Sequence, residues 1–565
     1  MLYVCTMSKA DLKVSELVAK VERGELQLPE MQREYVWRAT RVRDLFDSLY
    51  RGYPSGVILA WESDEQVATR SFAIETEQKP SIRPLLLLDG QQRITSLSAV
   101  LRGKPVSVRG NKKPVEILFN LDHPEKLMHV TDIFENEDGD ELENDEVTEL
   151  GIQEQFKRMT FVVSSKALDS MLNWVRVTDI FTKPDTELLQ NAGILTFTDP
   201  RFEKYSSRIK AVRAIADYQY RMDILERDKS YEEVTEIFVR VNSLGVKLRS
   251  SDLALAQITA KWKGSLALFR GYQDKVSTLG FDFELGTYLK TMMAIITGQS
   301  KFLTVNSIPL KDLESGWTES KKALDFAFNF IRANLGIDSP TLLSSPFLVV
   351  TTAFWAHKNE FKVSGVDEAS FKKWFLVANA KGRYSRGSSE SLLDQDLVVI
   401  RNGGTGEELM VRLEQQVGRL SFTPEELVGR SSRSGAFKCL FLAFKSDKAK
   451  DWSTNLEISA KHQGKSDAIE YHHIFPKAYL KRLRPDIDRT LVNDIANLAF
   501  IGSTTNKKIS DRSPEEYKSK FLQDVLDVQL IDFTNERDNP ENFEYFISER
   551  RKAIALRLNE FLKLS

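Results

Sequence analysis

Two adjacent histidines, His472 and His473, lie in the stretch IEYHHIFPKAYL of a chain with only six histidines in 565 residues. Asn497 follows 24 residues after His473, and Asn506 follows nine residues later. A neutral imidazole can take a proton from water near neutral pH. An amide oxygen suits a hard cation such as Mg²⁺, and an imidazole ligand extends the choice to Mn²⁺ and similar ions. These residue types could support metal-assisted hydrolysis of a phosphodiester.

The elements that position these residues are predicted to be two strands and a helix. EYHHIF predicts the first strand, NLAFI the second, GSTT a turn and NKKIS the start of a helix. A further helix is expected at SPEEY, with Ser513 as its N-cap. On its own, the histidine pair favours a partly buried, hydrogen-bonded pair beside a turn. The asparagine spacing favours a catalytic site, as does the surrounding segment 430–484, which has twelve basic and five acidic residues.

This stretch resembles the HNH, or His-metal finger, nucleases, in the variant with an HIFP core and a downstream Asn-Lys-Lys. The resemblance implies that His473 is the general base and that Asn497 holds the loop carrying it. It implies that His472 and Asn506 are the metal ligands, although the family more commonly has Asp at the first of these positions. Lys508 could contact phosphate. His462 is given no role.

A second motif lies in RPLLLLDGQQRITSLSAVL, which predicts a buried strand, an Asp-Gly turn and a helix. Backbone N–H groups at the start of a helix can bind an anion. Arg93 adds a planar cation suited to phosphate, and Asp89 could hold a metal ion or orient water. Asp-Gly is also common in ordinary turns, so the motif alone is weak evidence.

Two further stretches support a site near this turn. LPEMQREYVW contains Gln32 and Arg33, and FVRVNSLGVKL contains Arg240 and Asn242. Together with DGQQR they resemble the amino-terminal half of GmrSD-type proteins, whose domain is similar to the ParB and sulfiredoxin fold and binds nucleoside triphosphates. The resemblance implies a site for GTP, ATP or UTP that comprises Asp89, Gly90, Gln91, Gln92, Arg93, Gln32, Arg33, Arg240 and Asn242. Tyr35 and Trp37 could stack on a base or belong to the core.

The fold class expected is an α+β multidomain protein. We expect an α/β, ParB-like domain that binds and hydrolyses nucleotide at residues 1–260, a helical coupling region at 261–424 and a helical domain carrying a ββα-metal nuclease motif at 425–565. The segment GRYSRGS, around Arg383 and Tyr384, is expected to make either a basic contact between domains or a contact to DNA.

Composition and charge limit the classes of protein to which the chain could belong. The net charge of −2 argues against a simple nucleic-acid coat, and ten of the twenty residues 131–150 are acidic, as in a solvated loop. The apolar runs fall well short of the roughly 20 residues of a membrane span. The start of the sequence is not typical of a signal peptide, and Cys5 and Cys439 lie far apart, so we expect a reducing, cytoplasmic location.

Both motifs on one chain resemble single-chain, GmrSD-like Type IV restriction enzymes and related phage-defence nucleases. The resemblance implies a triphosphate-regulated, divalent-metal-dependent endonuclease that nicks or cuts modified phage or plasmid DNA. It leaves open the DNA modification and whether the chain forms a homo-oligomer. The alternatives are a nucleotide-switched DNA-binding protein with an inactive nuclease site and an RNA-cleaving toxin.

Overall fold

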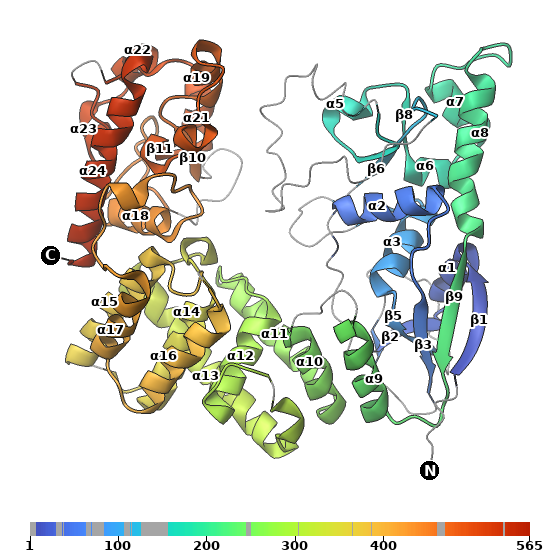
Figure 1. Cartoon of the computed structure of the whole chain (residues 1–565), viewed down its shortest axis with the longest axis horizontal. Coiled ribbons are helices and arrows are strands. Elements are labelled where there is room, and N and C mark those ends of the chain that lie inside the picture. Colours follow the sequence, from blue (N-terminus) through green and yellow to red (C-terminus); the bar gives the residue numbers. More distant parts are fainter. Residues whose placement is uncertain are drawn as a thin grey trace. The chain divides into compact units, whose positions relative to one another are not determined.

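The chain forms two compact units in the computed structural model, Met1–Gly264 and Ser265–Ser565 (Figure 1). The structure describes residues 7–29, 37, 39–63, 69–70, 84–106, 114, 116–125, 156, 158–244, 250–302, 304–363, 365–385, 387–459, 469–534 and 537–564. Several predicted features lie outside these ranges, namely Gln32, Arg33, Tyr35, His462 and the acidic segment 131–150. Within the described residues, no helix is both long and apolar enough to cross a membrane.

The first unit is built on a mixed six-stranded sheet. Its strands, in spatial order, are β1 (Met7–Lys13), β9 (Gln219–Leu225), β3 (Ile58–Glu62), β5 (Leu85–Asp89), β2 (Leu26–Pro29) and β4 (Thr69–Arg70). β5 runs parallel to β2 and antiparallel to β3. The buried strand predicted from RPLLLLD is therefore confirmed. β5 is an interior strand, and Asp89 at its end pairs with Leu59 of β3.

Helices cover both faces of this sheet. One face packs on α1 (Val14–Glu22), α2 (Ala39–Tyr50) and α3 (Gln91–Leu101), and Leu87 belongs to that core. Its strand neighbours Leu86 and Leu88 belong to the core on the other face, with α9 (Tyr231–Leu244) and α10 (Ser250–Lys261). Successive strand residues point to opposite faces. A strand covered on both faces must be apolar throughout, which explains the run of four leucines.

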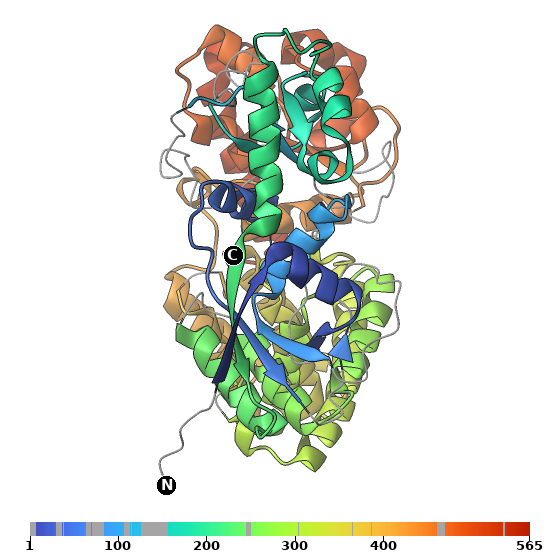
Figure 2. The same cartoon turned by 90° about the vertical axis from the view of Figure 1, so that its right-hand side faces the viewer.

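A smaller layer completes the first unit. A three-stranded sheet has the order β7 (Phe161–Val163), β6 (Ile117–Asn120) and β8 (Trp174–Arg176). The helices around it are α5 (Lys166–Asp169), α6 (Val177–Thr182), α7 (Asp185–Asn191) and α8 (Phe202–Arg213). After α8 the chain passes through one 3-10 turn, Ala214–Asp217, and enters β9 (Figure 2). This passage links the small sheet to the large one.

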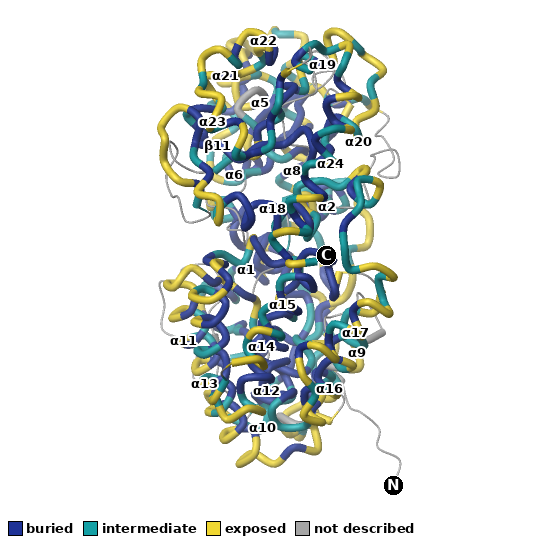
Figure 3. The backbone as a smooth tube through the Cα atoms, turned by 90° about the vertical axis from the view of Figure 1, so that its left-hand side faces the viewer, coloured by how far each residue is buried: buried dark blue, intermediate teal, exposed yellow. Residues whose placement is uncertain are grey.

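The second unit opens with a bundle of helices. They are α11 (Ser265–Thr278), α12 (Leu285–Thr297), α13 (Leu310–Leu335), α14 (Phe347–Lys358), α15 (Gly365–Lys381), α16 (Ser389–Arg401), α17 (Gly406–Val417) and α18 (Gly435–Ser446). α14 is buried along nearly its whole length (Figure 3). The described part of 265–446 contains no strand, as the sequence predicted.

The second unit ends in a hairpin surrounded by helices. β10 (Ile469–His473) pairs antiparallel with β11 (Leu498–Gly502). The connection between them carries α19 (Lys477–Leu483) and α20 (Arg489–Val492), and the chain continues through α21 (Ser503–Ile509), α22 (Pro514–Tyr517), α23 (Gln523–Asp527) and α24 (Phe543–Leu562). Both predicted strands are confirmed, and so is the N-cap at Ser513, whose hydroxyl accepts from the N–H of Glu516.

The predicted GSTT turn is wrong, because α21 begins directly after β11 at Ser503. The buried carboxylate of Asp451 accounts for the difference. It accepts from the N–H of Gly502 (2.7 Å) and from the hydroxyl of Thr505 (2.7 Å). An isolated Gly-Ser-Thr-Thr run favours a turn because these side chains bond nearby backbone groups. Here a partner distant in sequence takes up the Thr505 hydroxyl, so it no longer competes with the helical backbone.

Arg383 and Tyr384 make neither of the two expected surface contacts, because both side chains are buried. Arg383, only 1% exposed, donates to both carboxylate oxygens of Asp396 on α16, at 3.0 and 2.8 Å. It also bonds Gln416 on α17 (2.6 Å). The hydroxyl of Tyr384 donates to Asp396 (2.7 Å) and lies 2.8 Å from the hydroxyl of Thr351 on α14. Arg383 and Tyr384 thus form an internal network with side chains of three helices, α14, α16 and α17.

We predict that Asp396→Asn destabilises the second unit by about 3–5 kcal/mol, because it leaves the Arg383 guanidinium buried without its counter-charge. The free energy of unfolding in urea, followed by tryptophan fluorescence, measures the change. Glu360→Gln is the control, because Glu360 and its partner Lys362 are both exposed and such pairs contribute little. A loss at Asp396 no larger than that at Glu360 would contradict this account.

Candidate functional site

The hairpin brings His472 against Asn506 of α21. His472 Nδ1 lies 2.7 Å from Asn506 Oδ1, and the His472 side chain is buried. The other amide atom, Asn506 Nδ2, donates to Glu470 Oε2 at 2.5 Å. Because Glu470 can only accept when ionised, it fixes the amide orientation and turns the oxygen towards His472. Glu470, which sequence reasoning missed, stands two residues before His472, the spacing that places both on one face of a strand.

These donors fit a hard divalent ion. One imidazole nitrogen and one amide oxygen lie side by side, and Mg²⁺ commonly uses one or two protein ligands together with waters and substrate oxygens. The second ring nitrogen, His472 Nε2, is buried without a hydrogen-bond partner. In the ion-free hydrogen bond Nδ1 carries the proton, which leaves a buried lone pair on Nε2. An ion held by His472 Nδ1 would require the proton to be on Nε2 instead. Among the described residues, no cluster of three His, Cys, Asp or Glu side chains could hold a metal ion.

His473, the next residue of β10, points to the opposite face of the strand from His472 and is oriented by a different residue. Its Nε2 is 3.1 Å from Oδ1 of Asn493, in the connection after α20. Because the amide oxygen accepts, Nε2 carries the proton and Nδ1 carries the lone pair. Burial, with a smaller contribution from the nearby charge of Lys477, lowers the pKa of His473 to about 3. The imidazole is therefore neutral at pH 7 and able to accept a proton. Sequence reasoning missed Asn493.

Asn497 fastens the chain that follows His473. Its Oδ1 accepts from the N–H of Phe475 (2.9 Å), and its Nδ2 donates to the carbonyls of Phe475 (3.1 Å) and Val492 (2.9 Å). Its own carbonyl accepts from the N–H of Ile474 (2.8 Å). The side chain is fully buried. These bonds join the start of β11 to the segment after β10. The catalytic importance of this fastening stays a prediction.

Two arginines of α24 brace the same segment. The guanidinium of Arg550, 3% exposed, donates to four carbonyls, those of Ala496 and Leu498 (both 2.8 Å), Gln529 (2.9 Å) and Leu530 (3.1 Å). The next residue, Arg551, pairs with the buried Asp494 at 2.7 Å. Sequence reasoning missed both, since Arg-Arg in a charged helix is typical of an exposed face.

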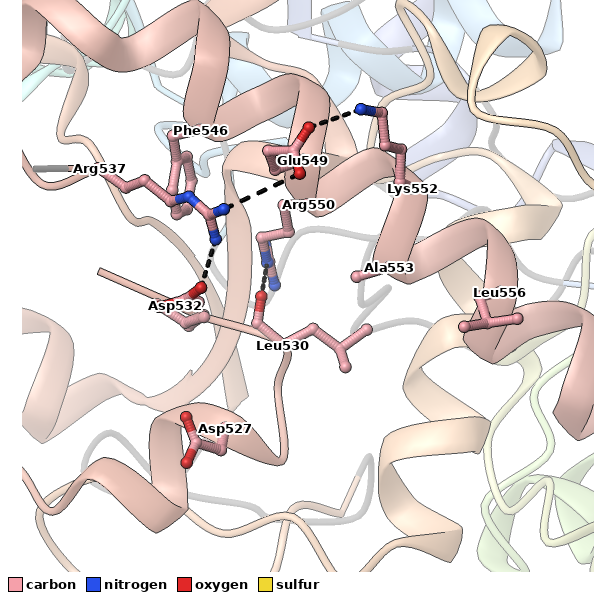
Figure 4. Close-up of a pocket in the computed structure, with 11 residues that line it drawn as sticks. Asp527, Leu530, Asp532, Arg537, Phe546, Glu549, Arg550, Lys552, Ala553 and Leu556 are labelled. Carbon is pink, nitrogen blue, oxygen red and sulfur yellow. Dashed lines mark hydrogen bonds and ion pairs between the residues drawn. The ribbon is translucent and has the colours of Figure 1, made fainter. Parts of the chain in front are cut away.

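A cavity of about 470 Å³ opens beside Arg550, lined by residues of α23, α24 and the segment between them (Figure 4). Its charged side chains pair with one another, Arg537 with Asp532 and Glu549, and Glu549 with Lys552. This paired lining makes the cavity a poor match for a phosphate group. Of the other predicted side chains, Lys508 is exposed and bonds Ser453 at 3.0 Å.

The amino-terminal motif also forms a defined structure. Gly90 has φ of 97°, a left-handed conformation that favours glycine, and it caps the start of α3. Arg93, on the first turn, donates to the carbonyls of Ser55 (2.6 Å) and Val57 (2.9 Å) and to Asp89 (3.1 Å). Its guanidinium also lies over the ring of Tyr220, 5.8 Å from the centroid. Arg93 therefore holds the 55–57 loop against the helix start.

The two glutamines of the motif are buried at the same helix start. Gln92 Oε1 accepts from the N–H of Trp37 (3.1 Å), and Trp37 itself packs partly buried against the core rather than standing free. Gln91 Oε1 is buried without a hydrogen-bond partner. A buried, unpaired amide oxygen is costly in a folded protein. A donor group on a bound nucleotide would satisfy it, so the residues present fit the expected ligand.

The structure does not bring Arg240 to this turn by any described contact. Arg240 lies on α9, exposed, in a pair with Glu236 on the same helix. α9 packs on the sheet through Val234 and Phe238, in the core opposite to that of α3. Asn242 lies on α9 too, but its side chain is outside the described part of the structure. The two residues therefore stay predictions that rest on the resemblance.

Comparison with known proteins gives matches to both ends of the chain. Residues 14–259 match the model for the GmrSD restriction endonuclease N-terminal domain, and residues 424–555 match the model for the GmrSD restriction endonuclease C-terminal domain. A protein of Methanocaldococcus jannaschii, described as "Uncharacterized protein MJ0686", is 24% identical over 551 residues, which cover 91% of this chain and 87% of that protein. The chain, with both domains in this order, belongs to the GmrSD restriction endonuclease family.

Proposed function

We propose that this protein is a triphosphate-regulated, divalent-metal-dependent DNA endonuclease of the HNH type that acts in modification-dependent restriction. Family membership supplies the coarser statement, a restriction endonuclease with DNA as its substrate. The observation that carries the finer one is the group at the end of β10. There Nδ1 of His472 and Oδ1 of Asn506 are adjacent, and the next residue of the strand is a neutral, oriented His473. A cytoplasmic location belongs to the same proposal.

Each side chain has a distinct part in the proposed reaction. His472 Nδ1 and Asn506 Oδ1 hold the ion, with Glu470 keeping the amide turned towards it. When bound, the ion supplies positive charge at the scissile phosphate and at the leaving oxygen. His473 takes a proton from the attacking water at Nδ1, while Asn493 holds the proton on Nε2. Asn497 keeps the chain after His473 in place, so the imidazole does not have to be reoriented during the reaction.

The amino-terminal unit is proposed to bind and hydrolyse GTP, ATP or UTP at the turn between β5 and α3. The left-handed Gly90, the N–H groups at the start of α3, Arg93 and the unpaired Gln91 Oε1 support the proposal. The nucleotide can regulate cleavage only through a difference in affinity between an active and an inactive state. The sensing of modified DNA is assigned to this unit as well.

We predict that His473→Ala abolishes plasmid cleavage in Mg²⁺ or Mn²⁺ while nucleotide turnover continues at the native rate, because only the proton acceptor of the nuclease is lost. Agarose gels report nicked and linear products, and phosphate release reports turnover. His357→Ala, which changes a histidine on α14 of the same unit, should leave both activities intact. Native cleavage by His473→Ala would overturn the nuclease assignment.

We predict that Arg93→Ala lowers nucleotide turnover more than it lowers cleavage measured without nucleotide. The reason is that the loop at 55–57 loses its contact with the start of α3. Phosphate release over a range of triphosphate concentrations is the measurement. Arg221→Ala serves as the control, since Arg221 is exposed and pairs with Asp223 on β9 of the same unit. Equal turnover in the two variants would remove Arg93 from the nucleotide site.

We predict that Asn493→Ala lowers the cleavage rate about 10- to 100-fold, the usual effect of removing a side chain that orients a functional imidazole. DNA affinity, measured without metal, should stay at the native value, because Asn493 is a positioning residue. Asn493→Asp keeps an acceptor for Nε2–H and should recover part of the rate. A parallel fall in DNA affinity, or no recovery by the aspartate, would point to a structural role instead.

A further inference from the structure

The segment between α18 and β10 contains a buried carboxylate that the proposed reaction does not use. Asp451 is 3% exposed, and its two oxygens accept five hydrogen bonds. Three come from the turn that follows, namely from the N–H groups of Ser453 (3.1 Å) and Thr454 (2.7 Å) and from the Thr454 hydroxyl (2.8 Å). The other two come from the N–H of Gly502 and the hydroxyl of Thr505, each at 2.7 Å. One carboxylate thus joins this turn to the start of α21.

The carboxylate of Asp451 has no capacity left to bind a metal ion itself. An ionised carboxylate offers about four lone-pair directions, and the five donors occupy them. Burial acts to raise the pKa of Asp451, but the hydrogen bonds outweigh it and hold the pKa below its usual value. Any contribution of Asp451 to the candidate site must therefore pass through the groups that it holds.

Two of these groups control the helix that carries a proposed metal ligand. Thr505 directly precedes Asn506 on α21, and Gly502 is the residue before that helix. The carboxylate holds α21 at both points, which fixes the rotation of the helix about its axis. Successive helical residues point about 100° apart, so the direction of the Asn506 side chain follows from this rotation. The Asn506 oxygen then lies 2.7 Å from His472 Nδ1.

The next residue of the same segment contacts the other proposed ligand. The Trp452 ring meets the His472 ring edge to face, with centroids 5.5 Å apart and an angle of 87° between the planes. Tyr517 and Phe521 pack on the same indole, at centroid separations of 6.2 and 5.5 Å. Trp452 is 6% exposed, and its N–H makes no hydrogen bond within the described structure. Ring packing therefore holds Trp452 against His472.

These contacts go beyond what the local turn requires. An Asp at the start of a turn commonly accepts from N–H groups two and three residues on, as Asp451 does from Ser453 and Thr454. Its bonds to Gly502 and Thr505 reach 51 and 54 residues along the chain. Two adjacent residues of one segment thus contact the surroundings of both proposed ligands.

We propose that Asp451 and Trp452 are positioning residues of the proposed metal site. Asp451 sets the direction of Asn506 through Thr505, and Trp452 holds the ring of His472. The inference rests on the proposed function, in which His472 Nδ1 and Asn506 Oδ1 hold the ion. An amide or imidazole that is free to turn must be ordered when an ion binds, which weakens binding. Side chains that hold metal ligands in place therefore contribute about 10- to 100-fold to metal affinity.

Mn²⁺ binding to the full-length protein, without DNA or nucleotide, tests the part of Asp451 through its partner. Thr505→Val removes the hydroxyl but keeps the shape of the side chain, and should weaken Mn²⁺ binding about 10-fold. Thr505→Ser keeps the hydroxyl and should bind Mn²⁺ with close to native affinity. Thr318→Val removes an exposed hydroxyl from α13 of the same unit, and as the matched control it should bind as the native protein does. Isothermal titration calorimetry gives the affinities.

The same titration tests Trp452. Trp452→Leu removes the aromatic ring from His472 and should weaken Mn²⁺ binding. Trp452→Phe keeps a ring at this position and should recover most of the affinity, because the indole N–H makes no described hydrogen bond. Each titration is made well below the unfolding midpoint of the metal-free variant, measured by circular dichroism, so that every variant is folded when metal is added.

Native affinity in folded Thr505→Val would overturn the part assigned to Asp451, and native affinity in folded Trp452→Leu would overturn that assigned to Trp452. Failure of Thr505→Ser or Trp452→Phe to recover binding would do the same for the residue concerned. His472→Ala separates these outcomes from failure of the proposed function. If His472→Ala loses Mn²⁺ binding while the Thr505 and Trp452 variants keep it, only the positioning inference fails. If His472→Ala binds Mn²⁺ as the native protein does, the proposed metal site fails and the inference fails with it.

Discussion

The buried amide of Asn497 is the contact on which the geometry of the candidate nuclease site depends. Three hydrogen bonds of its side chain join it to Phe475, just after β10, and to Val492 at the end of α20. A buried amide is tolerated only when its donors and acceptor are used, and here all are used. The chain after His473 therefore has one well-defined path. His472 and His473 can then face separate partners, although they are neighbours in sequence.

Four further side chains support the histidines or the backbone around Asn497. Glu470 and Asn493 act on the histidines or on their partner directly, while Arg550 and Arg551 act on the backbone on either side of Asn497. The segment before α18 joins the same backbone run, because the N–H of Gly429 donates to Asp494 and the Arg430 carbonyl accepts from the N–H of Ile495. The amino-terminal unit uses another device, a glycine-capped helix start held by one arginine.

Much of the fold and of the candidate site could be predicted from sequence, because the sequence patterns that indicate them involve residues close together in the chain. The run of leucines in β5, the glycine after Asp89 and the spacing from His473 to Asn497 and Asn506 each depend on residues close in the chain. The missed residues depend on long-range partners. Asn493 and Glu470 look like ordinary polar positions until β10 and β11 pair. Arg550 looks exposed because its four carbonyl partners lie 20 or more residues away. The Asp451 contact that turns GSTT into the first turn of α21 is invisible for the same reason.

The place of Arg550 late in the sequence has a consequence for protein synthesis. The carbonyls of Ala496, Leu498, Gln529 and Leu530 leave the ribosome before the guanidinium that gathers them. Domains generally fold in the order in which they are made, the amino-terminal one first. A nascent chain would therefore complete its amino-terminal unit while the hairpin of β10 and β11 still lacked its brace. The proposed nuclease site would be completed last, once the unit proposed to regulate it had already been formed.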